Sequence, residues 1–283
     1  MTRLAILMRR ELRERVLSKH FLIYLLLLLA PAGAGGWFSY ALHQDPSALI
    51  KITELLPSGP ITKVTASVCM MIYADILMIP MILTAVLQGG DSIAGEQSRG
   101  TLRLLISKPI HRWEIMLAKY VSFLIIFTPL TAASTLIMSL FVTAMGIGRV
   151  GTDLFLGYLT FFIATEMVYV SIATLFSSCT RRPLTAVAAA LVFVVLWMML
   201  ELVIPYMPQE TAESLKVLSP TNYANDILSY LSQGKAFPSI MGGFKAIVSF
   251  TEFLRSLAVV SALILVPLSL SLVALETRDI HGR

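Results

Sequence analysis

The sequence predicts an all-α membrane protein with six transmembrane helices, and two observations lead to this prediction. Hydrophobic residues make up 57% of the 283 residues and charged residues only 14%, whereas an ordinary soluble domain has about 25% charged residues. A water-soluble fold cannot bury so much apolar side chain, because apolar surface left in water is costly. The chain also contains six apolar runs of the roughly 20 residues that one helix needs to cross a bilayer.

The apolar runs follow one another along the chain. In order they are residues 21–42, 64–88, 120–145, 154–178, 184–204 and 257–275. At a rise of about 1.5 Å per residue, each run is long enough to cross the membrane, some of them with tilt. Each is expected to be a helix, because in lipid a backbone segment has to satisfy its own hydrogen bonds. Residues 1–283 are expected to form a single transmembrane domain.

The segment before the first run, residues 1–20, has helical periodicity and a basic side. Its apolar positions share one face, and they are Leu4, Leu7, Met8, Leu12 and Val16. Its charged positions lie elsewhere, among them Arg9, Arg10, Arg13 and Glu14. A helix of this kind lies in the membrane interface with its apolar side toward the lipid. The alternative is a cytoplasmic extension of the first span, and both interpretations place the segment at the inner surface.

Lys and Arg are distributed unevenly between the two sides of the predicted membrane. With the N-terminus inside, 15 of the 22 Lys and Arg residues lie on the cytoplasmic side, and such an excess is typical of cytoplasmic loops. Both termini of this multi-pass cell-membrane protein are therefore expected in the cytoplasm. The net charge of +5 follows largely from this bias, so we expect it to face the lipid bilayer and not nucleic acid.

The longest connection on the outer side is residues 205–255. Two stretches of it, 224–231 and 240–253, are too apolar for a solvated loop but are interrupted by Gly, Pro or charge. We expect short helices there that lie at the outer leaflet or dip into it, that is, a re-entrant region before the last span.

The cytoplasmic loop between the second and third spans, residues 89–119, is long and strongly charged. Its centre, 101–107, predicts a helix of about two turns, because Gly100 precedes it and Pro109 follows it. A second amphipathic helix, 112–119, leads into the third span. The short central helix has an apolar side that needs a partner, and a groove on a soluble protein would supply one. The inner membrane surface is the alternative, and spacing alone does not decide between them.

The loop also carries a motif of about 25 residues. The motif is Glu96-x-x-x-Gly100-Thr101-Leu102-x-Leu104-Leu105-x-Ser107-x-Pro109-Ile110-x-Arg112-x-Glu114-Ile115-x-x-x-Lys119. It resembles the first cytoplasmic loop of type-2 ABC exporter permeases, most of all the branch of the copper-processing permease that works with a nitrous-oxide-reductase maturation ATPase. The six-span layout with a basic N-terminal helix extends this resemblance to the whole chain.

The resemblance implies a coupling helix that fits a cleft of a separate nucleotide-binding subunit. It implies partner contacts for Gly100, Thr101, Leu102 and Leu105, with Ser107 and Pro109 in the same motif. Glu96 and Arg112 are implied to hold the shape of the loop. Two permease copies, most simply a homodimer, and two ATPases would form the working exporter, and residues 205–255 would match the outer re-entrant region of the family.

No ATPase is expected in this chain. The phosphate-binding motif Gly-x-x-x-x-Gly-Lys-Ser/Thr does not occur in the sequence. ATP and Mg²⁺ are therefore expected in the partner subunit, and we predict neither a cofactor nor a metal site in the permease. An intramembrane enzyme is disfavoured, because the zinc-protease motif His-Glu-x-x-His is missing and no His lies well inside a predicted span.

Two acids, Asp75 and Glu166, lie near the middle of the second and fourth predicted spans. Ionisable residues at this depth are costly and usually face protein or water, so they are candidates for a translocation path. Structural, hydrogen-bonded acids are the alternative. If the protein were instead a self-contained, ion-coupled secondary transporter, these acids would carry the ions, but that class favours inverted repeats, which the sequence does not show.

Four methionines, Met70, Met71, Met78 and Met81, cluster on the second span. Thioethers suit copper(I), but methionine also fills gaps between helices. No His or Cys is placed to complete a copper site, and the sequence does not identify the cargo.

Overall fold

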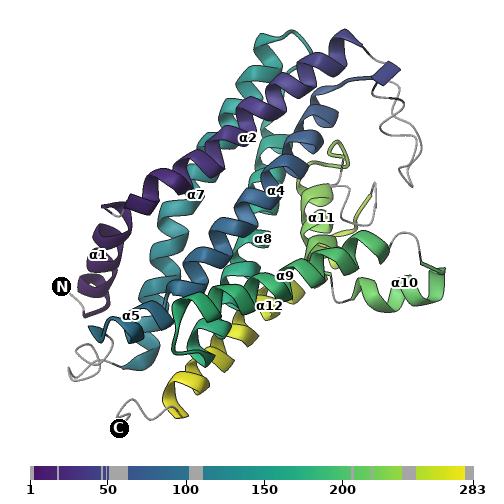
Figure 1. Ribbon diagram of the computed structural model, residues 1–283. Coiled ribbons are helices and arrows are strands. Elements are labelled where there is room, and N and C mark those ends of the chain that lie inside the picture. The colour runs from purple at the N-terminus through teal and green to yellow at the C-terminus, as the bar shows by residue number, and fades with distance from the viewer. Residues whose placement is uncertain are drawn as a thin grey trace.

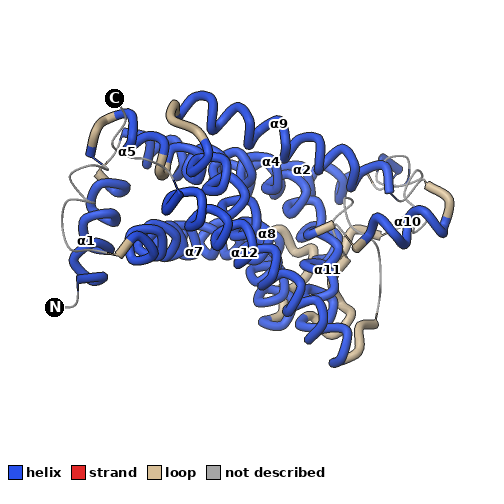
Figure 2. Tube along the Cα trace, turned by 90° about the horizontal axis from the view of Figure 1, so that it is seen from below, coloured by secondary structure: helices blue, strands red, loops and turns tan. Residues whose placement is uncertain are grey.

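The computed structural model describes residues 3–17, 19–45, 47–48, 50, 63–101, 111–204, 207–217, 219–237 and 247–277. Its helices are α1 (Arg3–Val16), α2 (Lys19–Gln44), α4 (Ala66–Asp91), α5 (Ala94–Ser98), α7 (Arg112–Ala144), α8 (Thr152–Cys179), α9 (Pro183–Val203), α10 (Gln209–Lys216), α11 (Pro220–Leu231) and α12 (Phe250–Thr277) (Figure 1). The described residues contain no strand (Figure 2). The predicted all-α class is confirmed.

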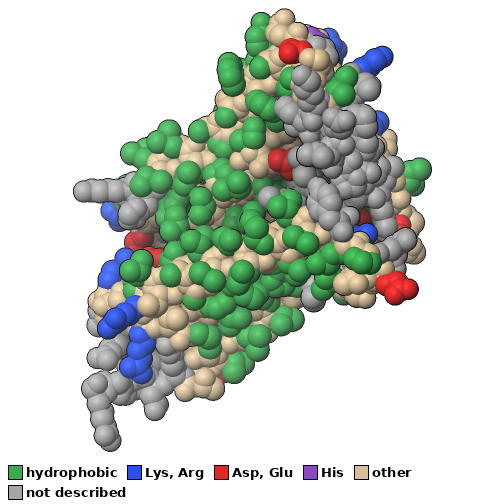
Figure 3. Space-filling view, turned by 45° about the vertical axis from the view of Figure 1, so that its right-hand side comes forward, with side chains coloured by type: hydrophobic (Ala, Val, Ile, Leu, Met, Phe, Trp, Pro, Cys, Tyr) green, Lys and Arg blue, Asp and Glu red, His purple; other side chains and the backbone are tan. Residues whose placement is uncertain are grey.

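Six of the helices are long and apolar enough to cross a membrane, namely α2, α4, α7, α8, α9 and α12. Each coincides with one of the six predicted runs. Figure 3 shows a broad hydrophobic surface across the middle of the molecule, with Lys and Arg side chains gathered toward its ends. Such a surface would be costly in water, so the protein is a multi-pass membrane protein.

The centre of the bundle is α8, which lies against α4, α7, α9, α11 and α12. Large side chains fill the space between α8 and α4; Tyr73 meets the ring of Phe162 edge-on, with centroids 5.6 Å apart. The methionines Met70, Met78 and Met81 of α4 are fully buried in this same apolar cluster. They therefore act as core packing, one of the two readings that the sequence left open.

Two glycines allow α4 to approach its neighbours closely. A Cβ placed on Gly89 would lie 2.6 Å from Ala173 Cβ and 2.8 Å from the carbonyl oxygen of Val170 on α8. A Cβ on Gly90 would lie 2.7 Å from a methyl group of Val187 on α9. α4 therefore packs closely against α8 and α9 just before it ends at Asp91.

The third span is longer than predicted. α7 runs from Arg112 to Ala144 without a break, so the predicted separate helix 112–119 is its first two turns. The charges of this segment ended the apolar run but not the helix, because Arg, Glu and Lys are good helix formers. At the start of α7 the His111 backbone N–H donates to Glu114 Oε2 over 3.1 Å, which satisfies one of the donors that a helix start leaves unpaired.

The region 205–255 contains two described helices, α10 and α11, before α12 begins at Phe250. The last span therefore starts earlier than the predicted residue 257. α11 lies against α8 and α12. The buried carboxylate of Glu201 in α9 accepts hydrogen bonds from Ser219 Oγ at 2.6 Å and Thr221 Oγ1 at 2.7 Å. This acid therefore fixes the start of α11 to the end of α9.

The N-terminal helix α1 differs from the prediction in what its apolar face contacts. Leu7 is buried with Ile115 and Ala118 of α7, whereas Val16, assigned to the same face, is 47% exposed. The face toward α7 also carries buried Glu11. This face meets protein because α7 offers both apolar side chains and a charge partner for Glu11, which lipid cannot.

Candidate functional site: the base of the loop between the second and third spans

The described parts of the loop between α4 and α7 lie at the end of the molecule that also holds α1 and the C-terminal end of α12 (Figure 1). The structure describes both sides of its base, residues 91–101 and 111–119, which we call the loop base. The predicted coupling helix falls mostly in residues 102–110, outside the described residues. Leu102, Leu105, Ser107 and Pro109 lie there, so their assigned roles stay predictions.

The first side of the loop base is fixed to α8 by one hydroxyl group. Ser177 Oγ accepts hydrogen bonds from the backbone N–H groups of Ile93 at 3.0 Å and Ala94 at 2.9 Å. All three residues are buried. The start of a helix leaves its first N–H groups unpaired, and here a side chain from a neighbouring span satisfies two of them.

A buried lysine joins the two sides of the loop base. Lys119 of α7 is only 5% exposed, and its Nζ lies 2.8 Å from Glu96 Oε1 of α5. The same Nζ lies 3.2 Å from Glu11 Oε1 of α1. Both glutamates are buried as well. The N-terminal helix and both sides of the loop base therefore meet at one ammonium group.

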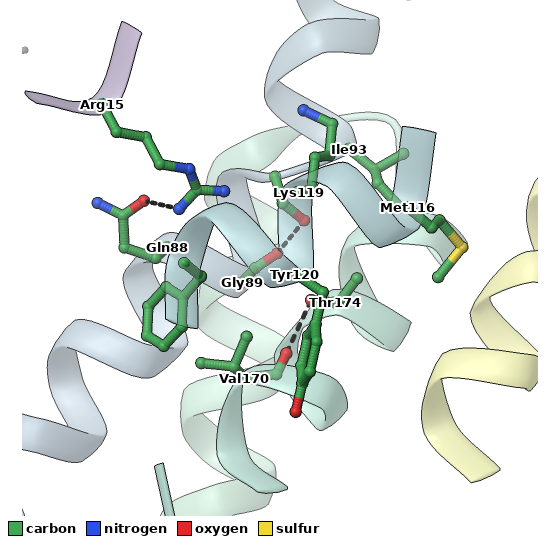
Figure 4. Close-up of a pocket in the computed structure, with 11 residues that line it drawn as sticks. Arg15, Gln88, Gly89, Ile93, Met116, Lys119, Tyr120, Val170 and Thr174 are labelled. Carbon is green, nitrogen blue, oxygen red and sulfur yellow. Dashed lines mark hydrogen bonds between the residues drawn. The ribbon is translucent and has the colours of Figure 1, made fainter. Parts of the chain in front are cut away.

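Arg15 extends this network toward α4. Its Nη1 donates to Gln88 Oε1 over 2.7 Å (Figure 4), and its Nε lies 4.0 Å from Glu11 Oε2. Burial lowers the pKa of Arg15, and the negative charge of Glu11 acts in the opposite direction. α1 is thus held against both α7 and α4 by charged or polar contacts.

A polar cavity of about 370 Å³ lies beside the network. Its lining charges are paired with each other: Arg10 Nε with Glu14 at 2.7 Å, and Arg99 with Asp91 at 3.6 Å. The hydrogen bond to Glu14 raises the pKa of Arg10. Glu11, Glu14 and Glu96 place one oxygen each within 4.8 Å of one another, but each of them already has a Lys or Arg partner.

The second side of the loop base is fixed to the last span. Arg112 Nη1 donates to the backbone carbonyl of Glu276 at 2.9 Å and to that of Leu275. The last carbonyls of a helix lack intrahelical donors, and a cation there is favourable. Beneath this contact Met116 packs with Ile93 and Leu275. The loop base therefore contacts α1, α8 and α12 through specific polar groups.

The sequence of this chain matches the family described as ABC-2 family transporter protein over residues 5–280. The match takes in all six membrane-spanning helices and the loop between α4 and α7. The chain is a member of the ABC-2 transporter family. It is the permease, the non-catalytic membrane subunit of an ATP-binding-cassette transporter. Among curated proteins none matches the sequence.

Family membership decides between the function classes that the sequence left open. The family match spans residues 5–280, so the chain is a permease of an ATP-binding-cassette transporter. No observation favours a self-contained, ion-coupled secondary transporter.

Three of the predicted loop residues have described contacts in the permease. Glu96 pairs with Lys119, and Arg112 donates to the end of α12. Thr101 Oγ1 donates to the Glu96 carbonyl over 3.2 Å. Gly100 has a φ of 74°, the left-handed conformation that favours glycine, and it ends the turn after α5.

The sequence assigned no role to Glu11, Ser177 or Lys119. For Glu11 there was a signal, since it is one turn after Leu7 on the apolar face of the N-terminal helix, where an acid needs a partner. Ser177 had none, because a single serine in a span is ordinary.

The two intramembrane acids lie in different settings. Glu166 of α8 is fully buried, and neither carboxylate oxygen has a hydrogen-bond partner among the described residues. Thr131 of α7 lies beside it. Asp75 of α4 is only partly buried. A path that uses both acids stays a prediction.

Proposed function

We propose that the permease is driven by a separate ATPase subunit that binds the loop between α4 and α7, with ATP and Mg²⁺ held by that subunit. The loop base supports this proposal. It is fixed to α1 and α8 by buried polar contacts and to α12 by the Arg112 hydrogen bonds, so a displacement of the loop tip would act on several spans together. A loop that merely rested on the membrane would need no such anchorage.

We further propose that this end of the permease faces the cytoplasm, with both termini inside. The N-terminal helix, the loop base and the end of α12 lie at the same end of the molecule (Figure 1). Most of the 22 Lys and Arg residues are assigned to this side, as expected for a cytoplasmic face.

We propose two permease copies in the working transporter, as the resemblance implies. Gly35 and Gly36 of α2 could have allowed close packing between two copies, but both pack within their own chain. A Cβ on Gly35 would lie 3.3 Å from Tyr73, and one on Gly36 would lie 3.1 Å from Phe141, both of the same chain. These two glycines therefore do not by themselves mark a surface for the second copy.

We propose that the permease is similar to the copper-processing branch of the family and works as an exporter. The cargo itself is not identified. Support for this similarity lies in the loop motif alone, since the methionines of α4 are used in core packing.

The test of the ATPase contact is co-purification of the tagged permease with a soluble ATPase. Wild type is expected to retain the ATPase, while Leu102→Asp and Thr101→Arg lose most of it, because charge at an apolar contact is costly to desolvate. The matched controls are Val217→Asp and Thr152→Arg, which place the same charges on exposed positions away from the loop. Undiminished binding in both loop variants would refute the coupling role.

A further inference from the structure

Lys119 is an unusual residue for the start of a membrane span. Burying an ammonium group is expensive unless charges and hydrogen bonds compensate it. Lys119 has two compensating carboxylates, Glu96 Oε1 at 2.8 Å and Glu11 Oε1 at 3.2 Å. They come from two different helices, one from α5 within the loop base and the other from the N-terminal helix.

The three groups are mutually dependent. Without Lys119, two buried carboxylates would face each other, because oxygens of Glu11 and Glu96 lie within 4.8 Å of one another. Arg15 cannot replace Lys119, since its Nε is 4.0 Å from Glu11 and its Nη1 is engaged by Gln88. Like charges at such a distance repel strongly in a buried site, so α1 and α5 would be driven apart.

The connections of α1 make this separation consequential. Apart from Lys119 and Arg15, its described anchors are apolar: Leu7 and Met8 pack with α7 residues, and Leu12 packs against the main core cluster. The opposite side of α1 is exposed, including Ile6 and Arg13. The ammonium of Lys119 is therefore the direct polar link between the loop base and α1.

We propose that Lys119 is a positioning residue that fixes α1 to the loop base, so that α1 moves with the loop when the transporter works. This inference rests on the proposed coupling function. The N-terminal helix then has a mechanical role, in addition to any contact with lipid. The cluster of Lys119, Glu11 and Glu96 sets how α1, α5 and α7 are positioned relative to one another.

The first experiment measures hydrogen exchange of the full-length permease in lipid nanodiscs, with no ATPase present. In Lys119→Met we expect amides of residues 3–17 and 92–101 to exchange about tenfold faster or more, because local opening becomes easier. The control is Lys235→Met, which removes an exposed ion pair with Asp153 and should leave both segments unchanged. Wild-type exchange at residues 3–17 in Lys119→Met would overturn the proposal.

The second experiment restores the cluster with its charges exchanged. Glu11→Lys with Lys119→Glu keeps one lysine and two glutamates within the same short distances. We expect slow exchange at residues 3–17 to return in this double variant, even if Lys119→Met folds poorly. Continued fast exchange in a folded double variant would contradict the pairing.

The third experiment separates positioning from structural support. In the complex with its ATPase, Lys119→Met is expected to retain ATPase binding but to lower ATP hydrolysis per bound subunit, and Lys119→Arg to restore it. If Lys119→Met shows fast exchange at residues 3–17 but unchanged ATP hydrolysis, the positioning role is overturned. The contact between Lys119 and α1 would still stand. If wild type binds no ATPase, the proposed function fails, whatever the exchange data show.

Discussion

At the scale of single residues, the loop base shows how a few buried polar groups set the path of the chain. Ser177 Oγ accepts hydrogen bonds from two backbone N–H groups at 3.0 and 2.9 Å. Lys119 forms ion pairs with the carboxylates of Glu11 and Glu96. Each of these groups is costly to bury alone and favourable only with its partners. These contacts therefore fix the path of the chain at the loop base.

The first prediction concerns Ser177→Ala. Two buried N–H groups would lose their acceptor, at a cost of about 1–3 kcal/mol for each donor left unpaired. We expect a lower melting temperature and faster hydrogen exchange in residues 93–101. Ser178→Ala is the neighbouring control, because the Ser178 hydroxyl donates to the Leu175 carbonyl of its own helix. Equal effects of the two variants would argue against the role of Ser177.

The second prediction concerns Glu166, the fully buried acid of α8. Glu166→Gln keeps the shape of the side chain, so we expect stability within about 1 kcal/mol of wild type. If Glu166 lies on the translocation path, ATP hydrolysis by the reconstituted complex should fall. Thr131→Val, a neighbouring change that leaves the carboxyl in place, is the control. Normal hydrolysis in Glu166→Gln would leave Glu166 a structural acid.

At the scale of helices, close packing at the C-terminal end of α4 decides where the loop begins. Gly89 and Gly90 let α4 contact α8 and α9 at distances that no other side chain permits. The loop base then starts beside Ser177 of α8, within reach of its hydroxyl. A shift of α4 along α8 would break both contacts together.

The third prediction tests this crossing with Gly89→Ala. An alanine is normally the better helix former, by about 0.5–1 kcal/mol. Here its Cβ would lie 2.6 Å from Ala173 Cβ and 2.8 Å from a backbone oxygen, and overpacking of this kind costs about 1–3 kcal/mol. The clash should outweigh the propensity, so thermal unfolding is expected at lower temperature.

Gly33→Ala is the matched control in α2. No atom lies within 4 Å of a Cβ at that position, so only the helix propensity acts and stability should be unchanged or higher. A Gly89→Ala variant as stable as Gly33→Ala would show that α4 and α8 can separate without loss.

At the scale of the whole molecule, apolar surface and charge together suggest how the permease lies in the bilayer. The spans α9 and α12 are the least buried within the chain, with 22% and 11% of their central residues buried. Their exposed apolar surfaces are free to contact lipid or a second copy of the permease. The charged N-terminal helix and loop base share one end (Figure 1), which we propose faces the cytoplasm.

The fourth prediction tests that orientation through the two cysteines. Cys179 is exposed near the loop base, whereas Cys69 is buried. A membrane-impermeant maleimide should therefore label the permease in inside-out vesicles and not in intact cells, because it reaches only the exposed thiol. Cys179→Ser should abolish the label. Labelling in intact cells would place this end of the molecule outside.

Particular elements show how far the sequence could be read. The six spans were predictable because a run of about 20 apolar residues has few alternatives to a membrane helix. The helix starting at Arg112 was predicted, but its continuity with the third span was not stated, because a fall in hydropathy marks the edge of the lipid and not the end of a helix. The apolar face of α1 was assigned to lipid because periodicity identifies a face but not its partner.

The candidate site was predictable only in part. The motif from Glu96 to Lys119 marked the loop, and the family match is consistent with that reading. The contacts of its central helix, at Leu102 and Leu105, fall outside the described residues and stay predictions. Glu11 and Ser177 lie 85 and 81 residues from Glu96 along the chain, and no local pattern connects residues so far apart.

The sequence by itself determined the class of the protein, the number of spans, and the loop that carries the family motif, because composition and apolar length act locally along the chain. Only the tertiary structure decided that Lys119 serves both Glu96 and Glu11, that Ser177 holds the start of α5, and that α1 lies on α7. These pairings depend on which helices pack together, and a buried charge takes its partner from whichever helix the packing brings within reach.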